Sequence, residues 1–179
     1  MLNRYQWAAV AAALFIPSIV MAANSKTAKP GTALQNLAAF LLMVQYSEGT
    51  HGANAYRLLY GGGLFHSYDR HPNQRVSRWG ITSTAAGAYQ FLFNTWQSLA
   101  KDLTLIDFTP ASQNKAAIEL VRRKAALTDV LQGKIADAIY KCRKIWASLP
   151  GAGYGQNEKS IEDLLRFYVR AGGKLNTMS

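Results

Sequence analysis

The sequence predicts a mostly helical α+β domain, and three observations lead to this expectation. Apolar residues recur at helical spacing in several separate segments after residue 31. Residues 50–82 break this pattern with glycines 61–63, a His71-Pro72 step and short apolar runs, which are typical of turns and short strands. The 179 residues also suffice for one domain with a real core once the first two dozen are set aside. We therefore expect a helical body with a small β-containing lobe.

Five segments are expected to be helical, and ordinary start and stop residues mark their ends. The expected segments are 32–48, 83–99, 109–125, 135–146 and 159–171. The candidate N-cap residues are Thr32, Ser83 or Thr84, and Thr109. The candidate stop signals are Gly49, Pro150-Gly151 and Gly172-Gly173. Glu48 is then expected to project from the last turn of the first helix, where the chain changes direction.

The N-terminal residues have the layout of a secretory signal peptide. Arg4 precedes an apolar stretch, Trp7 to Val20, and a small-residue cleavage site ends at Ala22. The stretch is shorter than the roughly 20 residues of a membrane-spanning helix, and Pro17 interrupts it. Its alanine-rich character also fits an uncleaved signal-anchor that contacts the membrane transiently, and both interpretations predict export. The expected division of the chain is an export segment 1–22, a polar linker 23–31 and one domain 32–179.

The charge and the cysteine content limit the expected partners and cofactors. A net charge of +10 favours polyanions, and an exported protein meets peptidoglycan and lipid before nucleic acid, for which no motif is present. The single Cys142 excludes an intrachain disulfide and lies on the apolar side of a helical pattern, as a buried inert thiol would. His51, His66 and His71 lack the spacing of a zinc helix, so neither a metal nor a cofactor is expected.

Glu48 is the strongest candidate for a catalytic residue. Asp69 is the only other acidic residue between Glu48 and Asp102, and its turn context suggests a structural or solvated role. A carboxylate at a helix C-terminus is disfavoured by the helix dipole, and such local conflicts concentrate at functional sites. Cleavage of a glycosidic bond needs an acid of this kind, although hydrolases commonly use two.

Other side chains are candidates for sugar binding, each with a structural alternative. Gln90 can both donate to and accept from sugar hydroxyls, and the small residues 85–88 would allow a close approach of the backbone. Tyr89 is equally well explained as a half-buried core aromatic, and Gln90 as a solvated side chain. Tyr154 lies in a glycine-rich loop and Trp79 in a loop-like context, where an indole can stack on a sugar.

Together these segments resemble the lambda-type phage endolysins, which are lytic transglycosylases of the lysozyme superfamily. The motifs that carry the resemblance are Ser47-Glu48-Gly49-Thr50, Gly61-Gly62-Gly63-Leu64-Phe65, His71-Pro72, Ser83-Thr84 through Gly87-Ala88-Tyr89-Gln90, the run from Ile145 to Gln156, and Ala171-Gly172-Gly173. They occur in the order of the family and span residues 34 to 175. The chain departs from the family pattern in its export segment and in a shortened loop after Thr50.

The resemblance implies a lysozyme-like fold with a substrate cleft between a helical lobe and a small β lobe. It implies that Glu48 alone serves as acid and then as base at the bond between N-acetylmuramic acid and N-acetylglucosamine, giving a 1,6-anhydro product. The substrate-binding residues that it implies are Ser83, Thr84, Gly87, Tyr89, Gln90, Tyr154 and Gln156.

Three alternatives to a transglycosylase remain open at this point. They are a hydrolytic muramidase, a non-catalytic wall-binding protein on the same scaffold, and killing through cationic disruption of membranes. The biological role is either lysis by a phage or local wall opening, and a monomer is expected.

Overall fold

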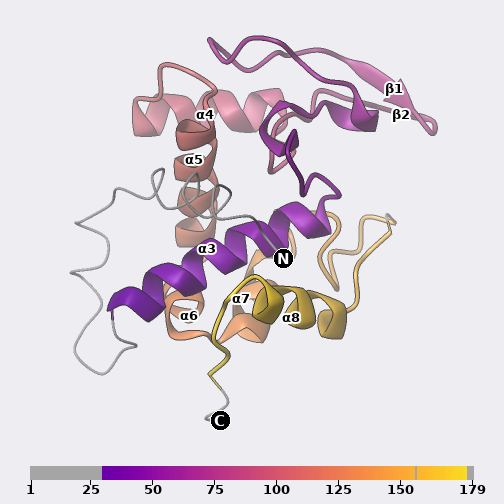
Figure 1. The fold of residues 1–179 in the computed structure, drawn as a ribbon. Coiled ribbons are helices and arrows are strands. Elements are labelled where there is room, and N and C mark those ends of the chain that lie inside the picture. The colour runs from indigo at the N-terminus through magenta and orange to yellow at the C-terminus, as the bar shows by residue number, and fades with distance from the viewer. Residues whose placement is uncertain (1–29, 156, 177–179) are drawn as a thin grey trace.

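Helix α3 (Pro30–Ser47) runs through the middle of the molecule, and the other elements are arranged around it (Figure 1). The computed structural model describes residues 30–155 and 157–176. All residues from Leu37 to Gln45 are buried, as expected for a helix that is enclosed on every side. The helix is already formed at Pro30, so the expected N-cap at Thr32 is wrong; proline is well suited to a first helical turn.

The end of α3 has the hydrogen-bond pattern of a Schellman motif. The Thr50 N–H donates to the Gln45 carbonyl at 2.9 Å, and the Gly49 N–H donates to the Tyr46 carbonyl at 3.2 Å. Gly49 has the positive φ of 71° that this motif requires. The predicted stop at Gly49 is therefore confirmed, and Glu48 is the residue that caps the helix.

The remaining helices follow the predicted order but differ from the prediction in number and extent. They are α4 (Phe93–Leu103), α5 (Pro110–Arg123), α6 (Leu127–Gln132), α7 (Ile135–Cys142) and α8 (Ile161–Arg170), with single 3₁₀ turns at Ala55–Arg57 and Tyr60–Gly62. The predicted cap Thr109 is confirmed, since its side chain accepts from the Ser112 N–H. The short α6 was not expected, and α7 ends at Cys142 rather than continuing to Trp146.

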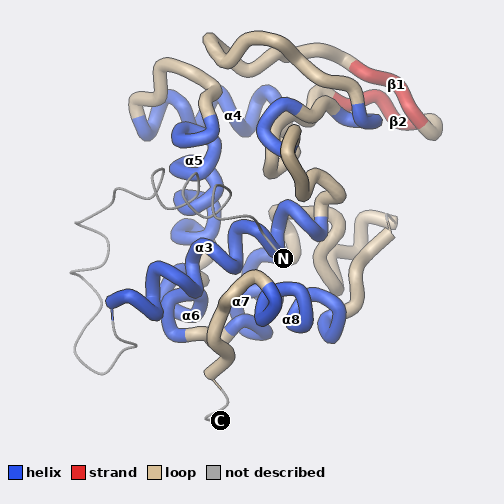
Figure 2. The backbone as a smooth tube through the Cα atoms, in the orientation of Figure 1, coloured by secondary structure: helices blue, strands red, loops and turns tan. Residues whose placement is uncertain are grey.

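A two-stranded antiparallel hairpin forms the predicted β lobe (Figure 2). Strand β1 (Val76–Arg78) pairs with β2 (Ile81–Ser83) so that Arg78 lies opposite Ile81. Trp79 and Gly80 form the connection, with φ of 51° and 76°. Positive φ at both loop residues is the geometry of a type I′ turn, which matches the twist of a hairpin. The mostly helical α+β class is thus confirmed.

The expected helix from Ser83 or Thr84 to Leu99 is wrong over its first half. Ala86 and Phe91 exchange two backbone hydrogen bonds across a tight turn in which Gly87 and Gln90 have positive φ of 78° and 47°. Helix α4 begins only at Phe93, whose N–H donates to the Thr84 hydroxyl at 3.1 Å. The N-cap residue of α4 is Leu92, so the predicted N-cap at Ser83 or Thr84 is wrong. The Thr84 hydroxyl nevertheless caps the first N–H of the helix from nine residues away.

One continuous hydrophobic core joins the helices to the β lobe. Trp96, Trp146 and Cys142 are buried in it, and the burial of Cys142 was predicted. Burial raises the pKa of the Cys142 thiol to about 12. Helix α3 packs against α6 and α8, and α4 packs against α5. None of the helices within the described residues combines the length and apolarity that crossing a bilayer requires.

Gly87→Ala is expected to destabilise the fold severely. An added Cβ would lie 2.3 Å from the Gln113 Oε1 atom, and Gln113 holds the Ala88 N–H and the Tyr56 and Phe108 carbonyls. Together with the positive φ, loss of these contacts should cost on the order of 4 kcal/mol. Gly80→Ala is the matched control, because Gly80 has the same positive φ with open space around it. Urea denaturation of both variants measures the difference; equal losses would contradict the packing role of Gly87.

Candidate active site

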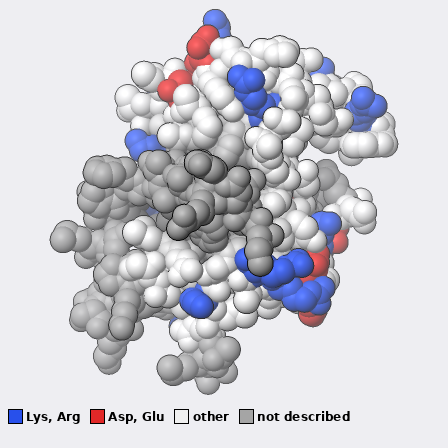
Figure 3. Space-filling view, viewed as in Figure 1, with Lys and Arg blue, Asp and Glu red and all other residues white. Residues whose placement is uncertain are grey.

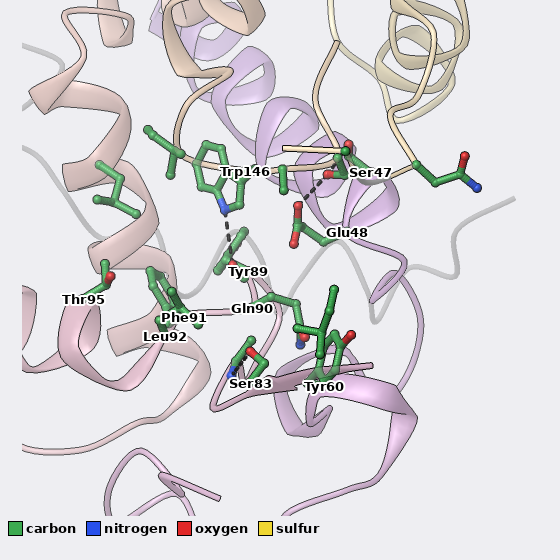
Figure 4. Close-up of a pocket in the computed structure, with 18 of the residues that line it drawn as sticks. Ser47, Glu48, Tyr60, Ser83, Tyr89, Gln90, Phe91, Leu92, Thr95 and Trp146 are labelled. Atoms are coloured by element: carbon green, nitrogen blue, oxygen red, sulfur yellow. Dashed lines mark hydrogen bonds between the residues drawn. The ribbon is translucent and has the colours of Figure 1, made fainter. Parts of the chain in front are cut away.

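A cleft of about 590 Å³ lies beside the C-terminal end of α3 (Figure 4). One part of its wall comes from the β lobe and the segment that follows it: Tyr60, Trp79, Ile81, Ser83, Ala85, Tyr89, Gln90, Phe91, Leu92 and Thr95. The other part comes from α3, α5 and the loop after α7: Ser47, Glu48, Leu120, Ile145, Trp146, Ala147, Ser148, Gly155 and Asn157. The cleft therefore lies between the small β lobe and the helical body, as expected.

Glu48 is held in this cleft by a chain of two serines. The Ser148 hydroxyl donates to the Glu48 Oε1 atom at 2.5 Å, and the Ser47 and Ser148 hydroxyl oxygens are 2.7 Å apart. A hydroxyl has one proton to donate, so Ser47 is the donor to Ser148 when Ser148 donates to Glu48. The contact fixes one carboxyl oxygen of Glu48 in the cleft.

The surroundings of Glu48 favour its protonated form. Burial raises the pKa of its carboxyl, while the hydroxyl and backbone N–H of Ser148 lower that pKa less strongly. The net shift is upward, because desolvation penalises the charged form. A raised pKa lets this carboxyl keep its proton at higher pH than a solvated glutamate does, which suits a general acid.

Glu48 is also the only charged side chain among the described residues that line the cleft. Asp69 does not line it; it is exposed, and its backbone N–H donates to the Ser67 hydroxyl in a local turn. A structural role for Asp69 agrees with this geometry. Within the described cleft, no second carboxylate stands opposite Glu48.

The loop after α7 that supplies Ser148 is firmly anchored. The Trp146 indole N–H donates to the Tyr89 carbonyl at 3.2 Å, which joins this loop to the segment that follows the hairpin. Farther along, the Glu158 carboxylate accepts from the N–H groups of Gly151 and Gly153 at 2.8 and 2.7 Å. Two glycines of the glycine-rich loop are thus held through their backbone by an anionic side chain.

Tyr89 faces away from the substrate side. Its hydroxyl donates to Asn114 Oδ1 at 2.6 Å and accepts from the Gln45 amide at 3.3 Å. Tyr56 donates to the same Asn114 oxygen at 2.9 Å. Burial raises the pKa of Tyr89 well above its usual value. The tyrosine therefore belongs to a buried polar network beneath the cleft. It is among the residues that line the cleft, but its side chain is almost fully buried.

The other predicted binding residues fall into four groups. Ser83 and Gln90 line the cleft, and the Gln90 amide donates to the Gly87 carbonyl at 3.1 Å. Thr84 and Gly87 do not line it, because the first caps α4 and the second is packed against Gln113. Tyr154 is exposed outside the cleft, with its hydroxyl donating to the Lys144 carbonyl. Gln156 lies outside the described residues.

Sequence reasoning missed the roles of Ser47 and Ser148. Both lie in motifs that carry the family resemblance, Ser47 next to Glu48 and Ser148 in the run from Ile145, but neither was predicted to belong to the site. Their separation of 101 positions hides the pairing. Trp146 is both buried and part of the cleft wall.

The Lys and Arg side chains of the described residues do not line the cleft. On the face shown in Figure 3, Lys and Arg stand in separate groups, and acidic side chains accompany some of them. The Arg166–Asp163 and Arg122–Glu119 ion pairs are of this mixed kind. In the part of the chain that the structure describes, no three histidine, cysteine, aspartate or glutamate side chains are grouped so as to hold a metal ion.

Comparison with known proteins gives a consistent result. The family model described as Endolysin matches residues 38–175. The endolysin of Escherichia phage P2 is 43% identical over 155 residues, covering 78% of this chain and 94% of the relative. The endolysin of Escherichia phage lambda is 41% identical over 142 residues, covering 75% and 90%.

Solved structures agree. Bacteriophage lambda lysozyme complexed with a chitohexasaccharide matches with a TM-score of 0.76 and 39% identity, covering 79% of this chain and 97% of that one. A second lambda lysozyme structure matches with a TM-score of 0.72 and 38% identity over the same shares. The chain therefore belongs to the endolysin family, of the lambda type, and has the lysozyme-like α+β fold that its motifs implied.

Proposed function

We propose that this protein is an exported enzyme that degrades peptidoglycan as a lytic transglycosylase, with Glu48 as its single acid and base. The observation that carries the proposal is the isolation of Glu48. It is the only carboxylate among the described cleft-lining residues, and burial raises its pKa. Family membership supports the coarser part, a lysozyme-type enzyme acting on cell walls.

The proposed reaction needs one proton donor that can take a proton back. Protonated Glu48 first donates its proton to the glycosidic oxygen between N-acetylmuramic acid and N-acetylglucosamine. The bond between this oxygen and the muramic anomeric carbon then breaks. The Glu48 carboxylate then accepts the proton of the muramic C6 hydroxyl as its oxygen bonds to the anomeric carbon. The product is a 1,6-anhydro sugar, no water is consumed, and Glu48 is protonated again. An attacking group within the same sugar is already close to its target, so no second carboxylate is needed.

The cleft suits a glycan strand. Its described wall combines neutral polar side chains, among them Ser83, Gln90 and Asn157, with aromatic and aliphatic ones. Sugars present hydroxyls at their edges and apolar C–H faces, which such a mixed wall can bind. The related lambda lysozyme was solved with a chitohexasaccharide, which supports a glycan ligand for this chain.

A hydrolytic muramidase is the second candidate, and the geometry favours it less. Water attack commonly uses a second carboxylate as base or nucleophile. Asp69, the only other acidic residue between Glu48 and Asp102, is not part of the described cleft. A purely binding protein is also disfavoured, since it gains nothing from a partly buried carboxyl whose desolvation costs stability.

Glu48→Gln is expected to reduce wall cleavage by at least about a thousandfold while fold and wall binding persist. The test uses purified peptidoglycan and mass spectrometry of the released muropeptides. The parent enzyme should give products that are lighter by one water and end in anhydromuramic acid. Products with reducing-end muramic acid would replace the transglycosylase by a hydrolase, and full cleavage by the variant would remove Glu48 from the mechanism.

Ser148→Ala is expected to alter the pH dependence of the rate. The Ser148 hydroxyl lowers the pKa of Glu48, so its removal raises that pKa. Because the acid must be protonated, the alkaline limb of the pH–rate profile should move to higher pH. The maximal rate should fall roughly tenfold or more, since the carboxyl loses its positioning contact.

Ser47→Ala is the companion variant, because it leaves the contact between Ser148 and Glu48 in place and removes only the next step of the chain. The alkaline limb of the pH–rate profile should move less in Ser47→Ala than in Ser148→Ala. An unmoved limb in Ser148→Ala would argue that this serine does not set the acidity of Glu48.

Export is proposed from the first 22 residues, which lie outside the described residues and outside the family match at 38–175. Arg4, the apolar stretch to Val20 and the site at Ala22 support it. We expect that full-length protein made in bacteria reaches the periplasm, either cleaved after Ala22 or held through this segment as a signal-anchor, and acts there as a monomer. Fractionation with intact-mass measurement distinguishes the two. Retention of all protein in the cytoplasm would refute the export proposal.

A further inference from the structure

Trp79 violates two local rules at the tip of the β hairpin. Its side chain is 80% exposed although it is large and apolar. Its backbone has φ of +51°, which is strained for a bulky residue, and asparagine or glycine is the usual choice at this position of a type I′ turn. Neither feature helps the fold. Strain and exposure of this kind are typical of functional positions.

The hairpin tip is held in a defined place. The Tyr60 hydroxyl donates to the Arg78 carbonyl at 3.4 Å, and the Tyr60 ring meets the Trp79 indole edge to face, with centroids 5.9 Å apart. The Arg78 side chain lies directly over Gly61, where an added Cβ would be 2.6 Å from its Cγ atom. The 3₁₀ turn Tyr60–Gly62 thus supports the hairpin from one side and leaves most of the indole surface free.

The exposed indole also lines the same cleft as Glu48, together with Ile81 and Leu92, which are likewise exposed. An apolar, rigid surface inside a cleft that holds a single charged group suits one chemistry in particular. It matches the C–H face of a sugar ring, whereas an anionic ligand would find no described cation lining this cleft.

We propose that Trp79 is a sugar-stacking residue that binds one ring of the glycan strand at the hairpin end of the cleft and makes the enzyme prefer long strands. This inference rests on the proposed glycan-cleaving function. Trp79 comes from the hairpin tip, whereas the acid comes from the end of α3, so the indole binds a sugar other than the one that reacts. Its contribution then appears in KM for long strands and not in kcat.

The test uses Trp79→Asn in a Glu48→Gln background, so that binding is measured without turnover. Asparagine suits the positive φ of the turn, so the variant should fold with an unchanged or higher Tm. Calorimetric titration with a chitohexasaccharide should show binding about tenfold weaker than in the Glu48→Gln parent. Titration with a chitobiose should show little change. Trp79→Phe should restore most of the affinity.

Ile106→Asn is the matched control, because Ile106 is an 89% exposed apolar residue that does not line the cleft. With Glu48 present, Trp79→Asn should raise KM for long peptidoglycan strands at unchanged kcat. Equal hexasaccharide affinity in Trp79→Asn and its parent would overturn the stacking role, while intact cleavage would leave the proposed function in place. The proposed function itself would be overturned if the unmodified enzyme cleaved no wall and the Glu48→Gln variant bound no glycan.

Discussion

The position of Glu48 depends on how helix α3 ends. Thr50 closes the helix through the Gln45 carbonyl, and its hydroxyl donates onward to the Ala88 carbonyl at 2.6 Å. The Gln45 amide reaches the Tyr89 hydroxyl, which binds Asn114 on α5. One buried hydrogen-bond network therefore connects the end of α3, the turn after the hairpin and α5. Because every member is buried, a shift of any one would leave polar groups without partners, and this cost fixes the carboxyl in space.

The same placement sets the acidity of Glu48 by two opposed effects. Burial against the cleft wall raises its pKa, and the Ser148 contacts lower it by a smaller amount. Burial alone would yield an acid that gives up its proton reluctantly, and a fully solvated carboxyl would have lost its proton before neutral pH. Ser148 comes from the loop anchored by Trp146 and Glu158. The acidity of Glu48 therefore depends on two segments, the end of α3 and the loop after α7, that are about a hundred residues apart in the sequence.

The features predicted correctly from sequence were those decided by local chemistry. Gly49 ends α3 because only its neighbours are needed for the Schellman bonds, and Thr109 caps α5 through Ser112, three residues away. The segment around Gly87 was wrongly expected to be helical because its conformation is imposed by Gln113, which is remote in sequence. The same limit applied to the site: Glu48 stood out by its isolation, whereas its partner Ser148 lies 100 positions away.

The net charge of +10 and the nearly uncharged cleft are two parts of one arrangement. Long-range attraction to an anionic wall requires only that cations outnumber anions over the surface, and it needs no cation near the bond that breaks. A cation beside Glu48 would stabilise the carboxylate and lower its pKa, against the need for a protonated acid. In the proposed mechanism, a described cleft without Lys and Arg keeps Glu48 protonated, while the positive charge elsewhere on the surface attracts the protein to an anionic wall.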